Sequence, residues 1–262
     1  MEENNRRKRI LLELDVKKSP ETVAYLKQHL NDEISSYDLA TELVLCDRTR
    51  DMPRVLFDYI VDLYKDAIEA ENTDAMNDLG ALYYDGRGCE QDFTKAVFYY
   101  DMAAQLGNQQ AQENLGYCYY YGRNLPVDYE KAFNYFALGA FDGRLISLYK
   151  IGDMYLNGYY VKKNPYEAFR IYERCIRNDL EPSVAGPLFL RLGNCFLNGL
   201  GTEENAETAL TCFQNAEHYL YDMVASGDVM YKKSLQAAIN GQIKAREKLT
   251  ADIPQKEWEH DD

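Results

Sequence analysis

Residues 115–143 read LGYCYYYGRNLPVDYEKAFNYFALGAFDG, and related stretches occur three more times in the chain. One begins 36 residues earlier, at Leu79, and another begins 36 residues later, at Ile151. The fourth begins at Leu192, after a longer step of 41 residues. A nearly fixed period of this size is typical of solenoids, in which supersecondary units stack and each packs on its neighbours. The repeat, rather than one central core, is therefore expected to organise this protein.

Each copy contains two helical patterns separated by a turn that carries glycine. In the first copy, Thr73 is expected to cap a helix with Ala75, Leu79 and Leu82 on one face. Glycine ends this helix because it adopts positive φ readily, and an aspartate or asparagine then caps the second helix. The terminators are Gly86, Gly122, Gly158 and Gly199, and the caps are Asp92, Asp128, Asn164 and Asn205. We therefore predict an all-α fold of stacked helix-turn-helix repeats.

A second glycine follows the leucine or isoleucine that opens each copy, inside the first helix. Glycine there costs about 1 kcal/mol relative to alanine, so its recurrence indicates a packing requirement. We expect the paired second helix to approach closely at this point, near a small residue of that helix. The glycines are Gly80, Gly116, Gly152 and Gly193, and the small residues are Ala96, Ala132, Ala168 and Ala209.

The repeats also predict how the whole chain is organised. Residues 1–72 should form N-terminal helices and a degenerate capping repeat, because a terminal repeat must meet water on one face. Residues 218–250 should form a degenerate C-terminal capping repeat ending in a helix from about Gln242 to Leu249, and residues 251–262 a disordered tail. Four repeats lie between these ends, at about 73–108, 109–144, 145–185 and 186–217.

Two segments depart from the repeat pattern. The extra residues of the third-to-fourth step lie between Arg177 and Pro187, and the proline and glycine residues there predict a longer loop between two helices. The N-terminal segment carries a basic cluster, which we expect to be a solvated, mobile tail. The cluster consists of Arg6, Arg7, Lys8 and Arg9.

The composition narrows the class of partner. The chain has 43 acidic and 29 basic residues, and its formal net charge is −14. A nucleic-acid partner is disfavoured because a binder must neutralise phosphates with a basic surface. No stretch approaches the roughly 18 apolar residues of a membrane span, and the N-terminus lacks the features of a signal peptide. We therefore expect a cytoplasmic protein that binds neither nucleic acid nor membrane.

The residues that usually carry catalysis or bind metals are scattered. The six cysteines form no CxxC pair, and the repeat positions of Cys118, Cys175 and Cys195 indicate small buried side chains. His29, His218 and His260 are solitary, and the sequence contains no phosphate-binding glycine loop or nucleophile motif. The sequence thus predicts no catalytic residue, no metal site and no cofactor.

The core pattern L-G-x-x-Y resembles the first helix of tetratricopeptide repeats. The fuller pattern, L-G-x-x-Y-x-x-G followed by D-x-x-K-A-x-x-Y-Y and A-A-x-x-G, resembles the Sel-one-like repeat family. The first copy matches it at Leu79, Gly80, Tyr83, Gly86, Gly88, Asp92, Lys95, Ala96, Tyr99, Tyr100, Ala103, Ala104 and Gly107. This resemblance implies a right-handed α-α superhelical solenoid that acts as an adaptor in protein complexes, without a shared active site.

A partner would then bind to the surface of the repeats. In tetratricopeptide-like solenoids the first helices line a concave groove, so their exposed positions are the candidates. Aromatic side chains at such positions carry much of an interface's energy, although these tyrosines could instead pack between adjacent repeats. The candidates are Asn77, Ala81, Tyr84, Asp85, Glu113, Tyr117, Tyr120, Tyr121, Tyr149, Asp153, Leu156, Asn157, Leu190, Asn194, Leu197 and Asn198.

Three functional hypotheses follow. The first is a non-enzymatic cytoplasmic adaptor whose concave face holds another protein or a peptide segment. The second is a regulator that responds to a small molecule or a short signalling peptide in the groove. The third is an enzyme of an unrecognised type. An open, shallow groove favours the first hypothesis, a deep enclosed pocket favours the second, and converging titratable groups in such a pocket favour the third.

Overall fold

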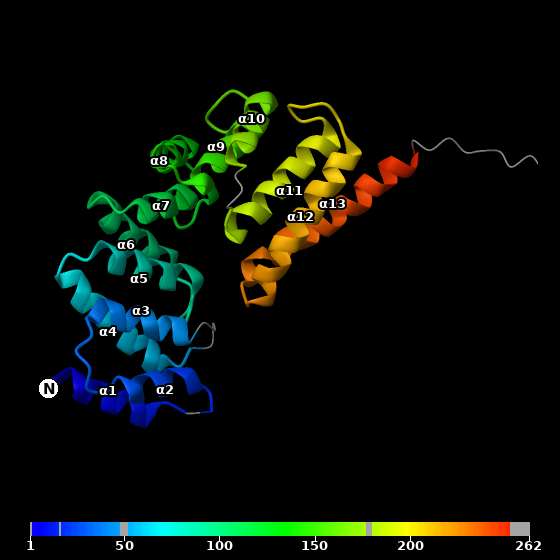
Figure 1. The fold of residues 1–262 in the computed structure, drawn as a ribbon. Helices are drawn as coiled ribbons and strands as arrows, with labels where there is room; N and C mark the ends of the chain where they lie inside the picture. Colours follow the sequence, from blue (N-terminus) through cyan, green and yellow to red (C-terminus); the bar gives the residue numbers. More distant parts are fainter. Residues whose placement is uncertain (1, 16, 48–51, 177–179, 252–262) are drawn as a thin grey trace, which may run out of the picture. The chain divides into compact units, whose positions relative to one another are not determined.

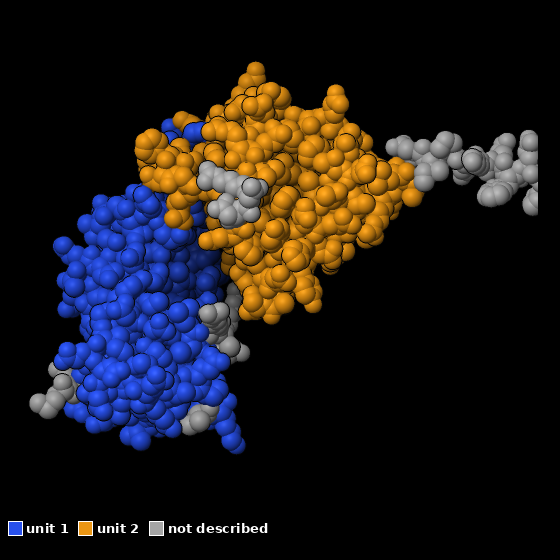
Figure 2. Space-filling model, in the orientation of Figure 1, with its two compact units in different colours: residues 1–135 blue, residues 136–262 orange. Residues whose placement is uncertain are grey.

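The computed structural model describes residues 2–15, 17–47, 52–176 and 180–251 (Figure 1). In these ranges the chain forms thirteen α-helices and one short 3-10 helix, and no strand. It divides into two compact units, Met1–Tyr135 and Phe136–Asp262 (Figure 2). Within each unit, helices that follow one another along the chain pack against each other, as expected for repeats that bury their apolar faces on their neighbours.

The first unit contains the N-terminal helices and the first two copies of the repeat. The N-terminal helices are α1 (Glu2–Glu13), α2 (Pro20–Gln28), α3 (Ser36–Cys46) and α4 (Arg54–Glu69). The repeat helices are α5 (Thr73–Asp85), α6 (Phe93–Gln105), α7 (Gln109–Tyr121) and α8 (Tyr129–Phe141), of which α8 continues past the boundary. One hydrophobic core runs from Ile10 in α1 to Cys118 in α7. The N-terminal helices therefore extend the core of the repeats.

The basic cluster at the N-terminus is not the mobile tail that we expected. It lies in α1, where Arg6 forms ion pairs with Asp62 at 3.2 Å and with Asp66 at 3.1 Å. Arg7 is only 1% exposed, and its guanidinium donates a hydrogen bond of 2.6 Å to the backbone oxygen of His29. This carbonyl lies at the C-terminal end of α2, where helical carbonyls lack intrahelical donors. The hydrogen bond to this carbonyl therefore offsets the free-energy cost of burying the Arg7 charge, and it caps the end of α2.

The glycine terminators and polar caps of the repeats are confirmed. Each first helix ends at a glycine in the left-handed conformation, with φ of 66° at Gly86 and 62° at Gly199. At the start of α6, the Asp92 side chain accepts a hydrogen bond of 3.0 Å from a backbone N–H, and the other three predicted caps do the same. One assignment was wrong by a residue, because Asn72 rather than Thr73 caps α5.

The glycine inside the first helix marks a close approach of the paired helix at Gly80, Gly152 and Gly193. A Cβ on Gly80 would lie 2.8 Å from the ring of Tyr100 and 3.2 Å from the backbone oxygen of Ala96. A Cβ on Gly152 would lie 2.5 Å from the ring of Tyr172. Each ring stands four residues after the predicted alanine, on the next turn of the second helix. The tightest contact is therefore with an aromatic ring rather than with the small residue that we expected.

The second unit contains the later repeats and the C-terminal helices. Its elements after α8 are α9 (Leu145–Asn157), α10 (Pro165–Cys175), α11 (Pro182–Asn198), α12 (Ala206–Ala225), η1 (Val229–Tyr231) and α13 (Lys232–Ala251). Its largest core cluster consists of buried side chains of α9, α10, α11 and α12. Smaller clusters join α11 and α12 to α13.

The loop predicted before the fourth repeat is wrong over most of its length. Residues from Pro182 onward belong to α11, which is a helix of 17 residues. Pro182 takes the first helical position, where its missing N–H costs nothing. Gly186 is buried against the second helix, because a Cβ there would lie 2.8 Å from Leu220. The extra residues thus lengthen a helix, while Arg177, with the two residues after it, lies outside the described residues.

The C-terminal helices are longer than predicted. Helix α12 continues to Ala225, and α13 is one helix from Lys232 to Ala251 rather than a short helix beginning near Gln242. Gly241 does not interrupt α13, and it packs closely on α12, because a Cβ at this position would lie 2.6 Å from the ring of Phe213. The predicted tail, apart from Ala251, lies outside the described residues, as does His260.

Candidate functional site

The predicted groove residues divide into a buried and an accessible set. We expected the residue two positions before the opening leucine or isoleucine of each copy to be exposed. In the first three copies this residue is buried. The buried residues are Asn77, Glu113, Tyr149, Asp153 and Leu197. The half-buried or exposed residues are Ala81, Tyr84, Asp85, Tyr117, Tyr120, Tyr121, Leu156, Asn157, Leu190, Asn194 and Asn198. Only the second set can offer side chains to a partner in this structure.

Four predicted tyrosines take part in aromatic clustering in the first unit. On α7, Tyr121 stacks on Tyr117 with ring centroids 6.2 Å apart, and it meets Tyr120 edge-on at 4.8 Å. On α5, Tyr84 meets the ring of Phe93 edge-on at 5.1 Å. We call the aromatic surface formed by these residues the aromatic face, and it also includes Tyr129 on α8. Its members are Tyr84, Phe93, Tyr117, Tyr120, Tyr121 and Tyr129.

Arg123 contacts the aromatic face at Phe93 on α6 and at Tyr121 on α7. Its guanidinium carbon lies 5.2 Å from the centre of the Phe93 ring and 5.7 Å from the centre of the Tyr121 ring. Both distances are within the range of cation–π attraction. Burial raises the pKa of the Tyr84 hydroxyl, and the adjacent Arg123 guanidinium opposes this rise. One arginine therefore contacts aromatic groups from three helical segments.

The aromatic face is accessible at its centre. Tyr121 is 50% exposed, and Arg123 is exposed, whereas the other rings are half-buried. Half-buried rings are held by their neighbours and still present one side to solvent. Such an arrangement offers large contact area with little loss of side-chain freedom on binding.

Other tyrosines of the repeat, which were not groove candidates, pack between the two helices of one repeat. Tyr83 on α5 stacks on Tyr99 of α6, with centroids 6.0 Å apart and planes within 4°. The Nζ atom of Lys95 lies 4.9 Å from the centre of the Tyr83 ring and 3.1 Å from the Asp92 carboxylate. The next repeat reproduces this stacking of one tyrosine on another. These signature tyrosines therefore stabilise a helix pair, in contrast to the tyrosines of the aromatic face.

In the second unit, one predicted groove residue is the centre of an ion-pair network. Asp153 on α9 accepts two hydrogen bonds of 2.6 Å from Arg191 on α11. Its carboxylate also lies 3.1 Å from the Nζ atom of the buried Lys150, and it accepts a hydrogen bond of 2.8 Å from the hydroxyl of Tyr172. The guanidinium of Arg191 in turn lies 4.4 Å from the centre of the Tyr149 ring. Asp153 and Tyr149 are thus part of the packing between first helices.

The electrostatics of this network keep Asp153 ionised. Burial alone raises the pKa of a carboxyl group, but the Arg191 and Lys150 charges and the Tyr172 hydrogen bond outweigh it and lower the Asp153 pKa to about 2. Burial and the carboxylate both raise the pKa of Tyr172. The lowered pKa of Asp153 and the raised pKa of Tyr172 both lie away from neutral pH, so the network has the character of a structural element.

Three exposed asparagines among the predicted groove residues of the second unit each use a side-chain donor within their own helix. The side-chain amides of Asn157, Asn194 and Asn198 each donate to the backbone oxygen four residues earlier, at 2.7 to 2.9 Å. A partner would therefore meet mainly the amide oxygens at these positions. The predicted groove residues of the second unit offer fewer aromatic contacts than those of the first.

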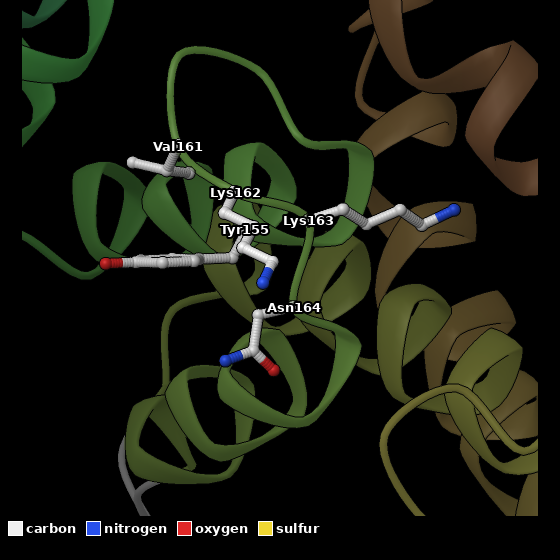
Figure 3. A pocket seen from close by; sticks show the side chains of 5 residues that line it. All are labelled: Tyr155, Val161, Lys162, Lys163 and Asn164. Carbon is white, nitrogen blue, oxygen red and sulfur yellow. The ribbon is translucent and has the colours of Figure 1, made fainter.

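A hollow of about 560 Å³ lies at the turn between α9 and α10 in the second unit (Figure 3). Its lining consists of Tyr155, Val161, Lys162, Lys163 and Asn164. Asn164 is engaged in capping α10, and the Lys163 side chain points away from the Tyr155 ring (Figure 3). Ligand pockets of similar volume are largely enclosed and bring several polar groups together. This hollow is open to solvent and its polar groups diverge, so it does not have the character of a ligand site.

The cysteines and the acidic residues do not assemble a reactive centre. None of the six cysteines forms a disulfide, and Cys118, Cys175 and Cys195 are buried as their repeat positions predicted. Cys212 is buried as well. Within the described ranges, no group of three or more histidine, cysteine, aspartate or glutamate residues could hold a metal ion. In the same ranges, no helix is both long enough and apolar enough to cross a membrane.

Sequence reasoning missed three members of the site. Phe93 and Tyr129 open second helices directly after the capping aspartates, and we had assigned them no role. Arg123 follows the terminating glycine of α7, where the sequence indicated only the end of a helix. An available signal was the arginine at the same repeat position in the first copy, Arg87.

Comparison with known proteins identifies the class of this fold. The model of the Sel1 repeat matches four segments of the chain, at residues 73–108, 109–140, 145–179 and 190–217. The protein is thus an α-solenoid built from short helix-turn-helix repeats, as the fold-class prediction stated. It belongs to the Sel1 repeat family, whose members are generally scaffolds for protein interactions.

Solved structures agree with this assignment at the level of the fold. A Sel1 repeat protein from Oxalobacter formigenes is similar over 88% of this chain and 96% of its own, with a TM-score of 0.60 and 20% identity. A protective antigen of uropathogenic Escherichia coli with an SLR fold matches with a TM-score of 0.56 and 20% identity. That match covers 83% of this chain but only 46% of the antigen. Among curated proteins, none matches the chain.

Proposed function

We propose that this protein is a non-enzymatic adaptor that holds a protein or peptide segment on the face of its first helices, in the cytoplasm. The aromatic face is the observation that carries this proposal. It combines a half-exposed Tyr121, several fixed rings and an exposed arginine, which are the residue types that dominate the energy of protein interfaces. The family assignment supports the same role, because Sel1 repeat proteins are generally interaction scaffolds.

The two alternative hypotheses find less support. A regulator that binds a small molecule would need an enclosed pocket with converging polar groups, and the hollow beside Tyr155 is open. An enzyme would need titratable groups poised near neutral pH in such a pocket. The ion-pair network around Asp153 instead fixes its charges, because Arg191 and Lys150 hold the carboxylate ionised.

The experiment that tests the proposal uses a random peptide library displayed on phage as the probe. Peptides selected on the wild-type protein are synthesised, and their affinities for wild type and Tyr121→Ala are measured by fluorescence anisotropy. We expect Tyr121→Ala to weaken binding about tenfold, as is common for an exposed aromatic residue at the centre of an interface. The matched control is Tyr221→Ala, which removes a similarly exposed tyrosine on α12 and should leave binding unchanged.

Unfolding curves of both variants establish that they are folded before binding is compared. Equal weakening by the two variants would indicate a general loss of structure. Full affinity in Tyr121→Ala would show that the aromatic face is not the binding surface, and the proposal would be wrong.

A further inference from the structure

Arg123 differs from the arginines of this chain that form ion pairs. Arg6, Arg9, Arg54 and Arg191 each contact a carboxylate at 3.2 Å or less. Within the described part of the chain, Arg123 forms no ion pair and contacts the rings of Phe93 and Tyr121 instead. The chain has far more carboxylates than basic groups, so an exposed arginine kept apart from them is notable.

The Arg123 guanidinium donates a hydrogen bond to the Tyr84 hydroxyl, and the aromatic contacts leave its remaining N–H donors available. A guanidinium that stacks on aromatic groups uses the face of its plane, while its N–H donors lie in the plane and point outward. Arginine has five such donors, arranged to bind both oxygens of a carboxylate. The rings of Phe93 and Tyr121 restrict the side chain before any partner arrives, so less conformational entropy is lost when a carboxylate binds.

We propose that Arg123 binds an aspartate or glutamate side chain of the segment held on the aromatic face. The proposal rests on the proposed function and specifies the chemistry of the partner. An apolar residue beside the acidic one would pack on the exposed Tyr121 ring, which lies against the guanidinium. The recognised element is therefore one acidic residue next to an apolar residue.

The net charge of the protein limits what this partner can be. At −14, the chain repels a strongly acidic segment at long range, and this repulsion extends over about 10 Å at moderate ionic strength. A single carboxylate that reaches Arg123 gains two charge-assisted hydrogen bonds at short range. Because of these two effects, we expect the protein to select peptides with one acidic residue among apolar neighbours and to reject peptides with a run of acidic residues.

The test compares selected peptides with variants of both partners. Peptides chosen from the phage-displayed random library are synthesised with amidated C-termini, and each acidic residue is replaced by its amide. We expect the decisive Asp→Asn or Glu→Gln change to weaken binding to wild type about tenfold, as for the loss of a hydrogen-bonded charge pair. The same change should have less than about a twofold effect on Arg123→Gln, because the partner charge is already absent.

Two further variants make the result specific. Arg87→Gln removes the arginine at the same repeat position one copy earlier, which is not stacked on a ring in the described structure, and it should behave like wild type. Arg123→Lys keeps the charge but loses the planar fork, so it should recover little of the affinity.

The outcomes separate this inference from the proposed function. If the acid-to-amide changes leave wild-type binding intact while Tyr121→Ala still weakens it, the role of Arg123 is wrong and the adaptor proposal stands. Dependence on a free C-terminal carboxylate instead of an acidic side chain also overturns the inference. If the library yields no binder, or Tyr121→Ala binds every peptide fully, both proposals fail together.

Discussion

Asp153 on α9 and Arg191 on α11 form a two-point ion pair between consecutive first helices of the second unit, with both N–O distances at 2.6 Å. The geometry is bidentate, since Arg191 Nε and Nη2 each bind a separate carboxylate oxygen. Asp153 is 9% exposed, so neither solvent nor salt screens this pair strongly. A polar contact of this kind fixes how one repeat sits on the next.

Removal of the carboxylate should destabilise the second unit. Asp153→Asn preserves the shape of the side chain but leaves the guanidinium of Arg191 without its counter-charge in a largely buried site. We expect a loss of about 3 kcal/mol in the free energy of unfolding, as for broken buried pairs. Urea unfolding followed by circular dichroism measures this change. Asp222→Asn, an exposed aspartate on α12, is the control and should change stability by less than about 0.5 kcal/mol.

The same ion pair predicts how the free energy of unfolding depends on pH. The Asp153 pKa is lowered to about 2 in the folded protein, below the ordinary aspartate value near 4. A lowered folded-state pKa contributes stability that is present above the unfolded pKa and is lost as pH falls through the folded pKa. The stability advantage of wild type over Asp153→Asn should therefore shrink by roughly 2 kcal/mol between about pH 4 and pH 2. An advantage that stays constant over this range would contradict the assignment of the shift to Asp153.

The ring of Phe213 on α12 should prevent any side chain from fitting at Gly193 on α11 without loss of stability. A Cβ on Gly193 would lie 2.7 Å from this ring, which is closer than Cβ atoms approach other groups in proteins. Alanine would gain about 1 kcal/mol of helix propensity, but the steric conflict should outweigh it. We therefore expect Gly193→Ala to lower the free energy of unfolding by about 1 to 3 kcal/mol. Urea unfolding again provides the measurement.

A double-mutant cycle distinguishes this steric cause from a backbone effect. In a Phe213→Leu background the smaller side chain can move aside, so Gly193→Ala should cost clearly less than in wild type. Equal costs in the two backgrounds would mean that the ring is not what excludes a side chain at Gly193.

The repeat pattern predicted the fold where one residue type has one local role. A glycine such as Gly86 ends a helix through its own backbone conformation, and a cap such as Asp92 binds a backbone N–H three residues away. Both roles are local and can be read in register from copy to copy. The loop prediction was wrong at Gly186, and the helix predicted to begin near Gln242 extends through Gly241. These glycines lie inside helices and are required by close contacts with Leu220 and Phe213.

The candidate site was predicted less completely, because its contacts join residues from different repeats. The face of the first helices did indicate Tyr84 and Tyr121, which repeat register places near equivalent helix ends. The partners of Asp153 could not be inferred, because the repeat position of Arg191 carries Asp78 in the first copy and Asn114 in the second. It is basic only in the last two copies, at Lys150 and Arg191. Arg123 was overlooked because its role depends on rings that only packing brings to it.

Thiol accessibility provides a last prediction, and it tests the packing of the repeats directly. Burial raises the pKa of Cys118 and Cys195 to about 12 and that of Cys212 to about 11, so these thiols are neither ionised nor accessible in the folded protein. Cys46 and Cys89 are only half-buried, although burial also raises their pKa. We expect a thiol-specific reagent at mildly alkaline pH to modify these two first, as identified by peptide mass spectrometry.

Denaturation provides the control for that experiment, because all six cysteines are free and should react together in urea. Reducing agent should leave the melting temperature unchanged for the same reason, since no disulfide constrains the unfolded chain. Rapid modification of Cys118 or Cys195 in the folded state would mean that the first helices open readily. A large drop in melting temperature on reduction would show instead that a disulfide contributes to stability, contrary to this structure.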